Sequence, residues 1–162
     1  MSRTIRSLIA TATIAAALSV VQPGHAGAAP DVVRPTRAGA AAVYFLPTER
    51  FLELKRRHEG PYNWSDDGCS VPAVLKVSVP VLRYASSTFA AQCAQHDFAY
   101  RNFGGSLHLD PSEARRRSVD RFFYAQMRTR CHRPDISRAH RVTRCLAYAR
   151  IFYVAVRTFG RL

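Results

Sequence analysis

Four cysteines in a chain of 162 residues constrain the fold more than any other feature of the sequence. They lie at positions 69, 93, 131 and 145, and an even number of cysteines in a short exported chain is typical of disulfides. The alternative is a zinc site, but the sequence lacks the C-x-x-C pair that such sites commonly use. Four cysteines allow three pairings. We expect Cys69–Cys93 and Cys131–Cys145, because this local pairing closes the shortest loops.

The N-terminus has the features of a signal for export. Arg3 and Arg6 give a basic start, an apolar run covers residues 8–21, and a stretch of small residues follows. This order is typical of a secretory signal peptide, which we expect to be cleaved after Ala26 or Ala28. A membrane anchor is the alternative, but the run is shorter than the roughly 20 residues that a spanning helix needs. We therefore predict a secreted protein without a transmembrane segment.

The length leaves room for one domain. We expect a signal peptide over residues 1–28, a flexible leader over 29–46 and one folded domain over 47–162. The leader is rich in Ala, Pro and Arg and shows no periodicity. The formal net charge of +13 favours anionic partners, such as lipid head groups or nucleic acid, without distinguishing between them. Nothing in the sequence requires more than a monomer.

The pattern of apolar residues predicts a small all-α domain that is crosslinked by two disulfides. Two long helices carry the candidate site. Such a small core is marginal without the disulfides. Helix signals, namely apolar residues at helical spacing, capping residues and terminal glycines, delimit the expected elements. We expect helices over 48–57, from Ser86 or Ser87 to 103, from Asp110 to about 130, and over 137–158. Between them we expect a polar loop over 62–70 and a loop or extended segment over 71–84, which contains two prolines.

The residues around Cys93 predict a metal site. Cys93 and Asp97 are four residues apart and share a helix face. A Cys69–Cys93 disulfide would carry Asp67 next to Asp97, and two adjacent carboxylates are commonly reconciled by a shared divalent cation. The carbonyl groups of a loop that contains Gly68 could add oxygen ligands, which favours calcium. The alternative is that both aspartates are solvated surface charges.

His96 points to a different side of the same helix and is a candidate general base. An apolar stripe on the following helix contains a single acid, Asp120. A buried acid needs a hydrogen-bonding partner, and a histidine that donates one ring N–H to Asp120 keeps its other nitrogen for a proton from water. The alternative is that His96 is a structural core residue. The combination predicts a metal-assisted hydrolase.

Three segments resemble one known family. The stretch CAQHDFAYRN over residues 93–102 resembles the C-x-x-H-D-F-x-Y-R-N signature of the prokaryotic and fungal secreted phospholipases A2. The stretch WSDDGC over 64–69 is similar to their calcium loop, and SVDRFFY over 118–124 is similar to their second catalytic helix. Cys131 and Cys145 fall where that family has its C-terminal disulfide. The resemblance covers residues 62–159.

The resemblance implies a calcium-dependent phospholipase A2 that acts on phospholipid at a membrane or micelle interface. His96 would activate the water that attacks the sn-2 ester, and Asp120 would orient His96. Asp67, the Gly68 carbonyl and Asp97 would hold the calcium ion. Tyr100 and Asn102 also match positions of the family signature. We interpret both as supports for the helix and its packing, although Tyr100 could equally contact the catalytic aspartate.

The sequence departs from the family at four places. One is Gly68, which replaces a bulkier residue and is harmless if only its carbonyl binds the metal. Asn63 stands where the family often has Asp, and Asp66 is an additional acid that could compete as a metal ligand. The interval between Cys69 and Cys93 is longer than usual, and the extra residues fall in the segment 71–84. We expect this segment either to line the acyl pocket and enter the lipid interface or to pack on the core.

Two other functions are compatible with the composition. One is a basic lipid-binding or membrane-active protein that retains the scaffold without turnover, against which the intact set His96, Asp97 and Asp120 argues. The other is a metal-dependent nuclease, but the motifs that usually set nuclease histidines are absent. We therefore expect no specific binding of nucleic acid.

Overall fold

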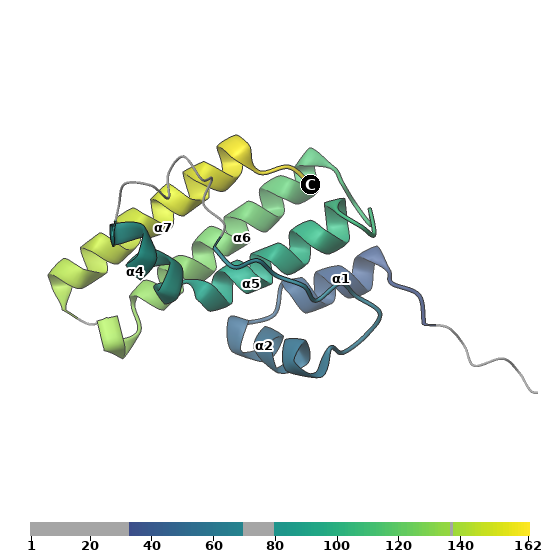
Figure 1. The fold of residues 1–162 in the computed structure, drawn as a ribbon, viewed down its shortest axis with the longest axis horizontal. Helices are drawn as coiled ribbons and strands as arrows, with labels where there is room; N and C mark the ends of the chain where they lie inside the picture. The colour runs from purple at the N-terminus through teal and green to yellow at the C-terminus, as the bar shows by residue number, and fades with distance from the viewer. Residues whose placement is uncertain (1–32, 70–79, 137) are drawn as a thin grey trace, which may run out of the picture. The chain divides into compact units, whose positions relative to one another are not determined.

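The computed structural model describes residues 33–69, 80–136 and 138–162, and over these residues it is all-α without strands, as predicted (Figure 1). The side chains of residues 80–83 are not described. The helices are α1 (Arg37–Tyr44), α2 (Thr48–Arg57), α4 (Pro80–Thr88), α5 (Ala90–Ala99), the π-helix η1 (Tyr100–Gly104), α6 (Glu113–Cys131), the 3₁₀-helix η2 (Pro134–Ile136) and α7 (Ala139–Phe159). None of the helices in these ranges is both long and apolar enough to span a membrane.

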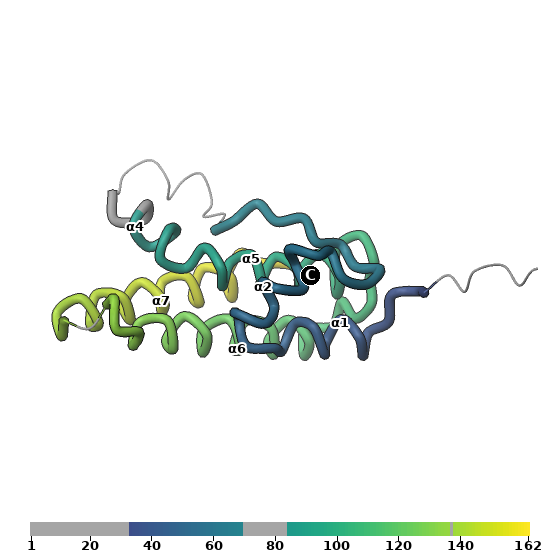
Figure 2. The backbone as a smooth tube through the Cα atoms, turned by 90° about the horizontal axis from the view of Figure 1, so that it is seen from below, coloured from purple at the N-terminus to yellow at the C-terminus, as the bar shows by residue number. Residues whose placement is uncertain are grey.

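Helices α5, α6 and α7 run side by side, with α6 and α7 antiparallel (Figures 1 and 2). One apolar cluster lies between them, and its largest members include Phe89, Phe123, Met127 and Phe152. Both predicted disulfides are confirmed. Cys69–Cys93 ties the loop before α4 to α5 with a Cα–Cα distance of 5.1 Å, and Cys131–Cys145 ties α6 to α7 at 5.6 Å.

A second cluster lies where α1 and α2 pack against α5. Phe51, Trp64 and Phe98 form its aromatic centre, with ring centroids of Trp64 and Phe98 4.6 Å apart. Tyr44 is buried in the same cluster, and its hydroxyl donates to the carbonyl of Val119 at 2.8 Å. This bond joins α1 to α6 one residue before Asp120.

The start of the domain differs from the expectation. Residues 37–44 lie in the stretch described above as a flexible leader, yet they form α1. Thr36 caps the helix by accepting from the Gly39 N–H at 3.0 Å, and Ala40 and Tyr44 are fully buried. The sequence does not display this helix clearly because only two of its eight positions, four residues apart, are fully buried.

The segment before the candidate base also differs. The prediction of a loop over 71–84 is wrong for residues 80–84, which begin α4, whereas residues 71–79 lie outside the described part of the chain. Pro80 occupies the first turn of α4, where backbone N–H groups make no hydrogen bond within the helix, so the missing N–H of proline costs nothing there. Ser86 and Ser87 lie inside α4 and are not caps. The chain breaks at the buried Phe89, whose ring packs against Phe152 at 5.9 Å.

The remaining boundaries follow the sequence signals within a few residues. Helix α2 covers the predicted residues 48–57, and α7 covers 139–159 instead of 137–158. The predicted cap of α6 is wrong by two residues: Ser112, not Asp110, accepts from the Arg115 N–H at 3.2 Å. Asp110 instead accepts from the Arg115 side chain at 3.0 Å.

Candidate active site

His96 and Asp120 form a buried pair between α5 and α6. His96 Nε2 lies 2.9 Å from Asp120 Oδ1, and the two side chains are 7% and 0% exposed. The imidazole lies between the rings of Tyr100 and Phe123, with centroid distances of 4.3 and 4.4 Å. Because a carboxylate only accepts, Nε2 carries the proton, and the other nitrogen of a neutral ring is an acceptor. In the described part of the chain Nδ1 makes no hydrogen bond, so it can accept a proton from water.

The surroundings keep this pair in the state that a general base needs. Burial lowers the pKa of His96 below its usual value, although the hydrogen bond with Asp120 acts in the opposite direction. Burial would raise the pKa of Asp120, but hydrogen bonds from His96, Arg157 and Tyr100 hold it below its ordinary value. At neutral pH the imidazole is therefore neutral and the carboxylate is charged.

Asp120 is bound by more groups than His96 alone. Tyr100 donates its hydroxyl to Oδ1 at 2.8 Å, and Arg157 donates from Nη1 to Oδ2 at 2.8 Å. The Arg116 guanidinium lies 3.8 Å from Oδ2. Burial and the nearby carboxylate raise the pKa of Tyr100, so its hydroxyl stays protonated and remains a donor. These donors compensate for the removal of the charge from water.

The two arginines also connect the last turn of α7 to α6. Glu113 accepts from Arg157 Nη2 at 2.5 Å and from Arg116 Nε at 2.6 Å. Arg116 Nη1 donates to the carbonyl groups of Val156, Arg157 and Gly160 at 3.1–3.3 Å, which satisfies the end of α7. The sequence contains no signal that singles out Arg116 or Arg157 among its many arginines, so the motifs predict a role for neither residue.

The candidate metal loop lies over the C-terminal end of α5 and over η1. The Asp67 N–H donates to Asp97 Oδ2 at 3.1 Å, and Asp67 Oδ2 lies 3.6 Å from the guanidinium of Arg101. Burial, together with repulsion from Asp67, raises the pKa of Asp97 to about 7. Gly68 has a φ of 72°, which L side chains rarely adopt. The structure thus brings the two predicted carboxylates together.

The carboxylates of Asp67 and Asp97 are oxygen donors of the kind that calcium prefers, and the two residues are in contact. Calcium takes six to eight oxygen ligands, a set that commonly mixes carboxylates, carbonyl groups and water. The described residues contain no group of three or more His, Cys, Asp or Glu side chains that could hold a metal, so carbonyl oxygens and water must complete the set. The carbonyl groups of Trp64 and Ser65 already accept from Lys55 and Arg101 at 2.7 and 3.3 Å. The carbonyl groups of Asp66, Asp67 and Gly68 follow in the loop.

Two residues that seemed to depart from the family are accounted for by other contacts. Asp66, the additional acid, forms an ion pair with Lys55 at 2.6 Å and therefore already has a partner. Asn63 Oδ1 accepts from the N–H and the hydroxyl of Ser65 at 3.0 and 2.6 Å, so it stabilises the turn that starts the loop.

Asn102 holds the loop against the helix, in agreement with the supporting position expected for it. Its side chain is fully buried and has partners on both ends. Oδ1 accepts from the Asn63 N–H at 2.9 Å, and Nδ2 donates to the carbonyl groups of Asn63 and Phe98 at 2.8 and 2.7 Å. The Asn102 side chain therefore supplies hydrogen-bond partners that the backbone of the loop would otherwise lack.

A pocket of about 360 Å³ opens next to these groups. Its lining includes Asp67, Asp97 and Tyr100, together with Arg161 and Leu162. Leu162 packs so closely on Gly104 that an added Cβ there would lie 2.1 Å from its carbonyl carbon. The end of the described chain thus forms one wall of the pocket.

Comparison with known proteins agrees with this geometry. The family model described as prokaryotic phospholipase A2 matches residues 40–160. The chain belongs to this family. A curated relative of this phospholipase A2 family member is the "Secretory phospholipase A2" of Beauveria bassiana (strain ARSEF 2860), with 30% identity over 120 residues. The match covers 73% of this chain and 55% of the relative, so the chain spans about half the length of that protein.

Proposed function

We propose that the protein is a calcium-dependent phospholipase A2 that hydrolyses the sn-2 ester of glycerophospholipids. The observation that carries this proposal is the buried His96–Asp120 pair with the imidazole Nδ1 left as an acceptor, in a chain of the phospholipase A2 family. The adjacent carboxylates of Asp67 and Asp97, which the free protein brings together at a cost, support the dependence on calcium.

In the proposed reaction His96 acts as general base. Nδ1 removes a proton from a water molecule as the water oxygen attacks the sn-2 carbonyl carbon. Asp120 holds the ring through Nε2–H and stabilises the imidazolium that forms. When the ester bond breaks, the imidazolium returns the proton to the departing oxygen, which yields a lysophospholipid and a fatty acid. A calcium ion held by Asp67, the Gly68 carbonyl and Asp97 would supply electrostatic stabilisation of the carbonyl oxygen and a site for the substrate phosphate.

We also propose that the protein is exported and acts as a monomer. Residues 1–28 would be removed as a signal peptide, and the substrate would be phospholipid at a membrane or micelle interface. The two disulfides support export, because such bonds persist in oxidising compartments. No specific affinity for nucleic acid is part of this proposal.

The decisive experiment measures release of the sn-2 fatty acid from phosphatidylglycerol and phosphatidylcholine vesicles. It compares calcium with chelator, and the native protein with His96→Ala. We expect release only with calcium and only with His96 present. Absence of release from every lipid by folded, oxidised protein would refute the enzyme and leave a basic lipid-binding scaffold. Release that persists with chelator would refute the calcium site alone.

A further inference from the structure

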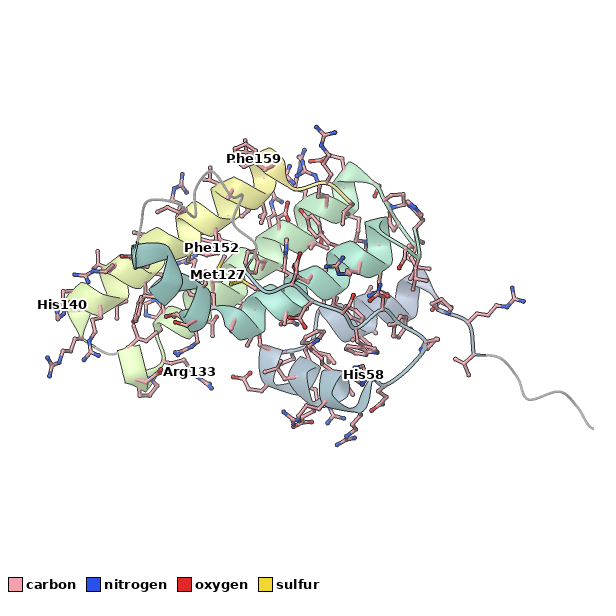
Figure 3. All side chains as sticks on the ribbon, in the orientation of Figure 1. His58, Met127, Arg133, His140, Phe152 and Phe159 are labelled. Carbon is pink, nitrogen blue, oxygen red and sulfur yellow. A yellow bond between two sulfur atoms is a disulfide. The ribbon has the colours of Figure 1, made fainter. Side chains whose placement is uncertain are left out.

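The outer face of α7 exposes large apolar side chains that the core does not use. Phe159, Val154 and Ile151 are 61%, 50% and 49% exposed. In Figure 3 Phe159 lies at the outer edge of the helix, whereas Phe152 of the same helix lies toward the helices beneath and is buried. A shallow depression of about 480 Å³ follows this face, and its lining is Ala147, Arg150, Ile151, Val154, Ala155 and Phe159. We call these six residues the α7 face.

The charge of the helix restricts what can cover the α7 face. Helix α7 contains no acidic residue, and Arg150 lies within the face itself. Arg144 is exposed two turns before Ile151, on the same side of the helix. A surface that is apolar and exclusively basic is complementary to a partner that is apolar and anionic.

A second copy of the chain does not fit this description. A symmetric contact through the α7 face would place Arg150 of both copies in one interface without an acid from the same helix to neutralise them. An anionic phospholipid bilayer meets both requirements, since it offers phosphate groups to arginine and acyl chains to the apolar residues.

The C-terminal end of the α7 face is close in the sequence to residues that line the pocket of the candidate active site. Phe159 is two residues before Arg161, and Arg161 and Leu162 line the pocket that contains Asp97 and Tyr100. The turn between them is fixed, because Arg116 donates to the Gly160 carbonyl at 3.1 Å. A bilayer on the α7 face would therefore meet the protein beside the pocket.

We propose that the α7 face is the surface by which the protein docks on an anionic phospholipid bilayer. Ile151, Val154 and Phe159 enter the boundary between head groups and acyl chains, and Arg150 contacts the phosphates. The proposal rests on the proposed function for its purpose, but docking itself needs neither calcium nor His96.

The test measures binding to vesicles of phosphatidylglycerol or phosphatidylcholine by co-sedimentation in chelator, so that turnover does not remove the vesicles. The variants are Ile151→Gln/Val154→Gln/Phe159→Gln together, Arg150→Gln, and Arg121→Gln as the control. Arg121 is exposed on α6, and among the described residues it forms no ion pair. Circular dichroism and thermal unfolding verify that each variant is folded, and Ile151→Gln alone serves if the triple variant does not fold.

We expect the triple variant to bind phosphatidylglycerol vesicles at least about tenfold more weakly, because half-exposed apolar side chains would lose their burial in lipid. Arg150→Gln should weaken binding to phosphatidylglycerol about fivefold and leave binding to phosphatidylcholine unchanged. Arg121→Gln should change binding by less than about twofold. Hydrolysis of a short-chain, monomeric phospholipid in calcium should be the same in the triple variant and the native protein.

The outcomes separate this proposal from the proposed function. Native affinity of the folded triple variant for vesicles overturns the docking surface, even if hydrolysis is normal. If the triple variant loses vesicle binding and the native protein hydrolyses no lipid, the docking surface is supported and the proposed enzyme activity is overturned. A native dimer that the triple variant abolishes in sedimentation velocity assigns the α7 face to a second copy and also overturns the proposal.

Discussion

Arg157 donates to Asp120 at 2.8 Å across 37 positions of the sequence, and Asp120 in turn binds His96. The same guanidinium binds Glu113, and these two carboxylates raise the pKa of Arg157 above its usual value. A permanent cation therefore faces the carboxylate that orients the candidate base.

Arg157→Gln should reduce kcat on a monomeric phospholipid about tenfold, because Asp120 loses a charge-assisted hydrogen bond and orients His96 less firmly. A double-mutant cycle on kcat measures the coupling: in an Asp120→Asn background the same substitution should cost nothing further. Glu113→Gln is the matched control, since it removes the other partner of Arg157 and should lower kcat less than threefold. Equal losses in both backgrounds would show that Arg157 does not act through Asp120.

Tyr100→Phe should have a small effect on kcat. The substitution removes the 2.8 Å bond to Asp120 Oδ1, but Asp120 keeps His96 on that oxygen and Arg157 on the other. We expect a loss of about 1 kcal/mol in the free energy of unfolding and less than about tenfold in kcat, measured by denaturant unfolding and by initial rates. A loss of kcat as large as that of Asp120→Asn would indicate a direct role for the Tyr100 hydroxyl.

Asp97→Asn should stabilise the calcium-free protein in a pH-dependent way. The pKa of Asp97 is raised from 3.8 to about 7 in the folded chain, so the folded state binds this proton more tightly than the unfolded state. Its contribution to stability is therefore present at low pH and is lost as the pH rises through about 7. In chelator, the stability advantage of Asp97→Asn should grow between about pH 4 and pH 7 and reach about 1–2 kcal/mol, since partial exposure screens the repulsion.

Thermal unfolding at several pH values checks this prediction. Asp66→Asn is the control, because Asp66 is paired with Lys55 and its removal should not stabilise the protein at any pH. In saturating calcium the order should reverse, since only the native carboxylate pair would gain stability from the metal. A difference between Asp97→Asn and the native protein that does not depend on pH would contradict the prediction.

Asn102→Ala should destabilise the protein by about 2–3 kcal/mol, because it removes a fully buried amide and leaves the Asn63 N–H and carbonyl without their partners. The apparent affinity for calcium should fall with it, since the loop that begins at Asn63 loses its attachment to η1. Denaturant unfolding and calorimetric titration with calcium measure the two effects. Ser106→Ala removes only the exposed 3.2 Å bond from Asn63 Nδ2 and should change both by little.

Short-range patterns in the sequence were sufficient for the elements that carry the site. His96 and Asp97 follow Cys93 by three and four residues, so helical geometry alone distributes them over neighbouring faces of α5. The single acid in the apolar stripe of α6 is Asp120, and its burial required a partner. Helical periodicity and local hydrogen bonding involve residues only a few positions apart, so they can be recognised from the sequence.

Contacts between segments far apart in the sequence could not be predicted from it. At the turn between α4 and α5 the buried ring of Phe89 packs on Phe152 of α7. In α1 the side chains of Ala40 and Tyr44 are buried in the core. Neither feature has a periodic signature, since each depends on a cavity that other elements create.

The sequence by itself determined the helical class, both disulfides and the residues from which a site could be built. Only the tertiary structure decided which arginines bind Asp120 and which side of α7 remains exposed. The reason is that the arginines are chemically identical in the sequence, and a side chain is selected for an ion pair or for the surface only by the position of its helix when the core is packed.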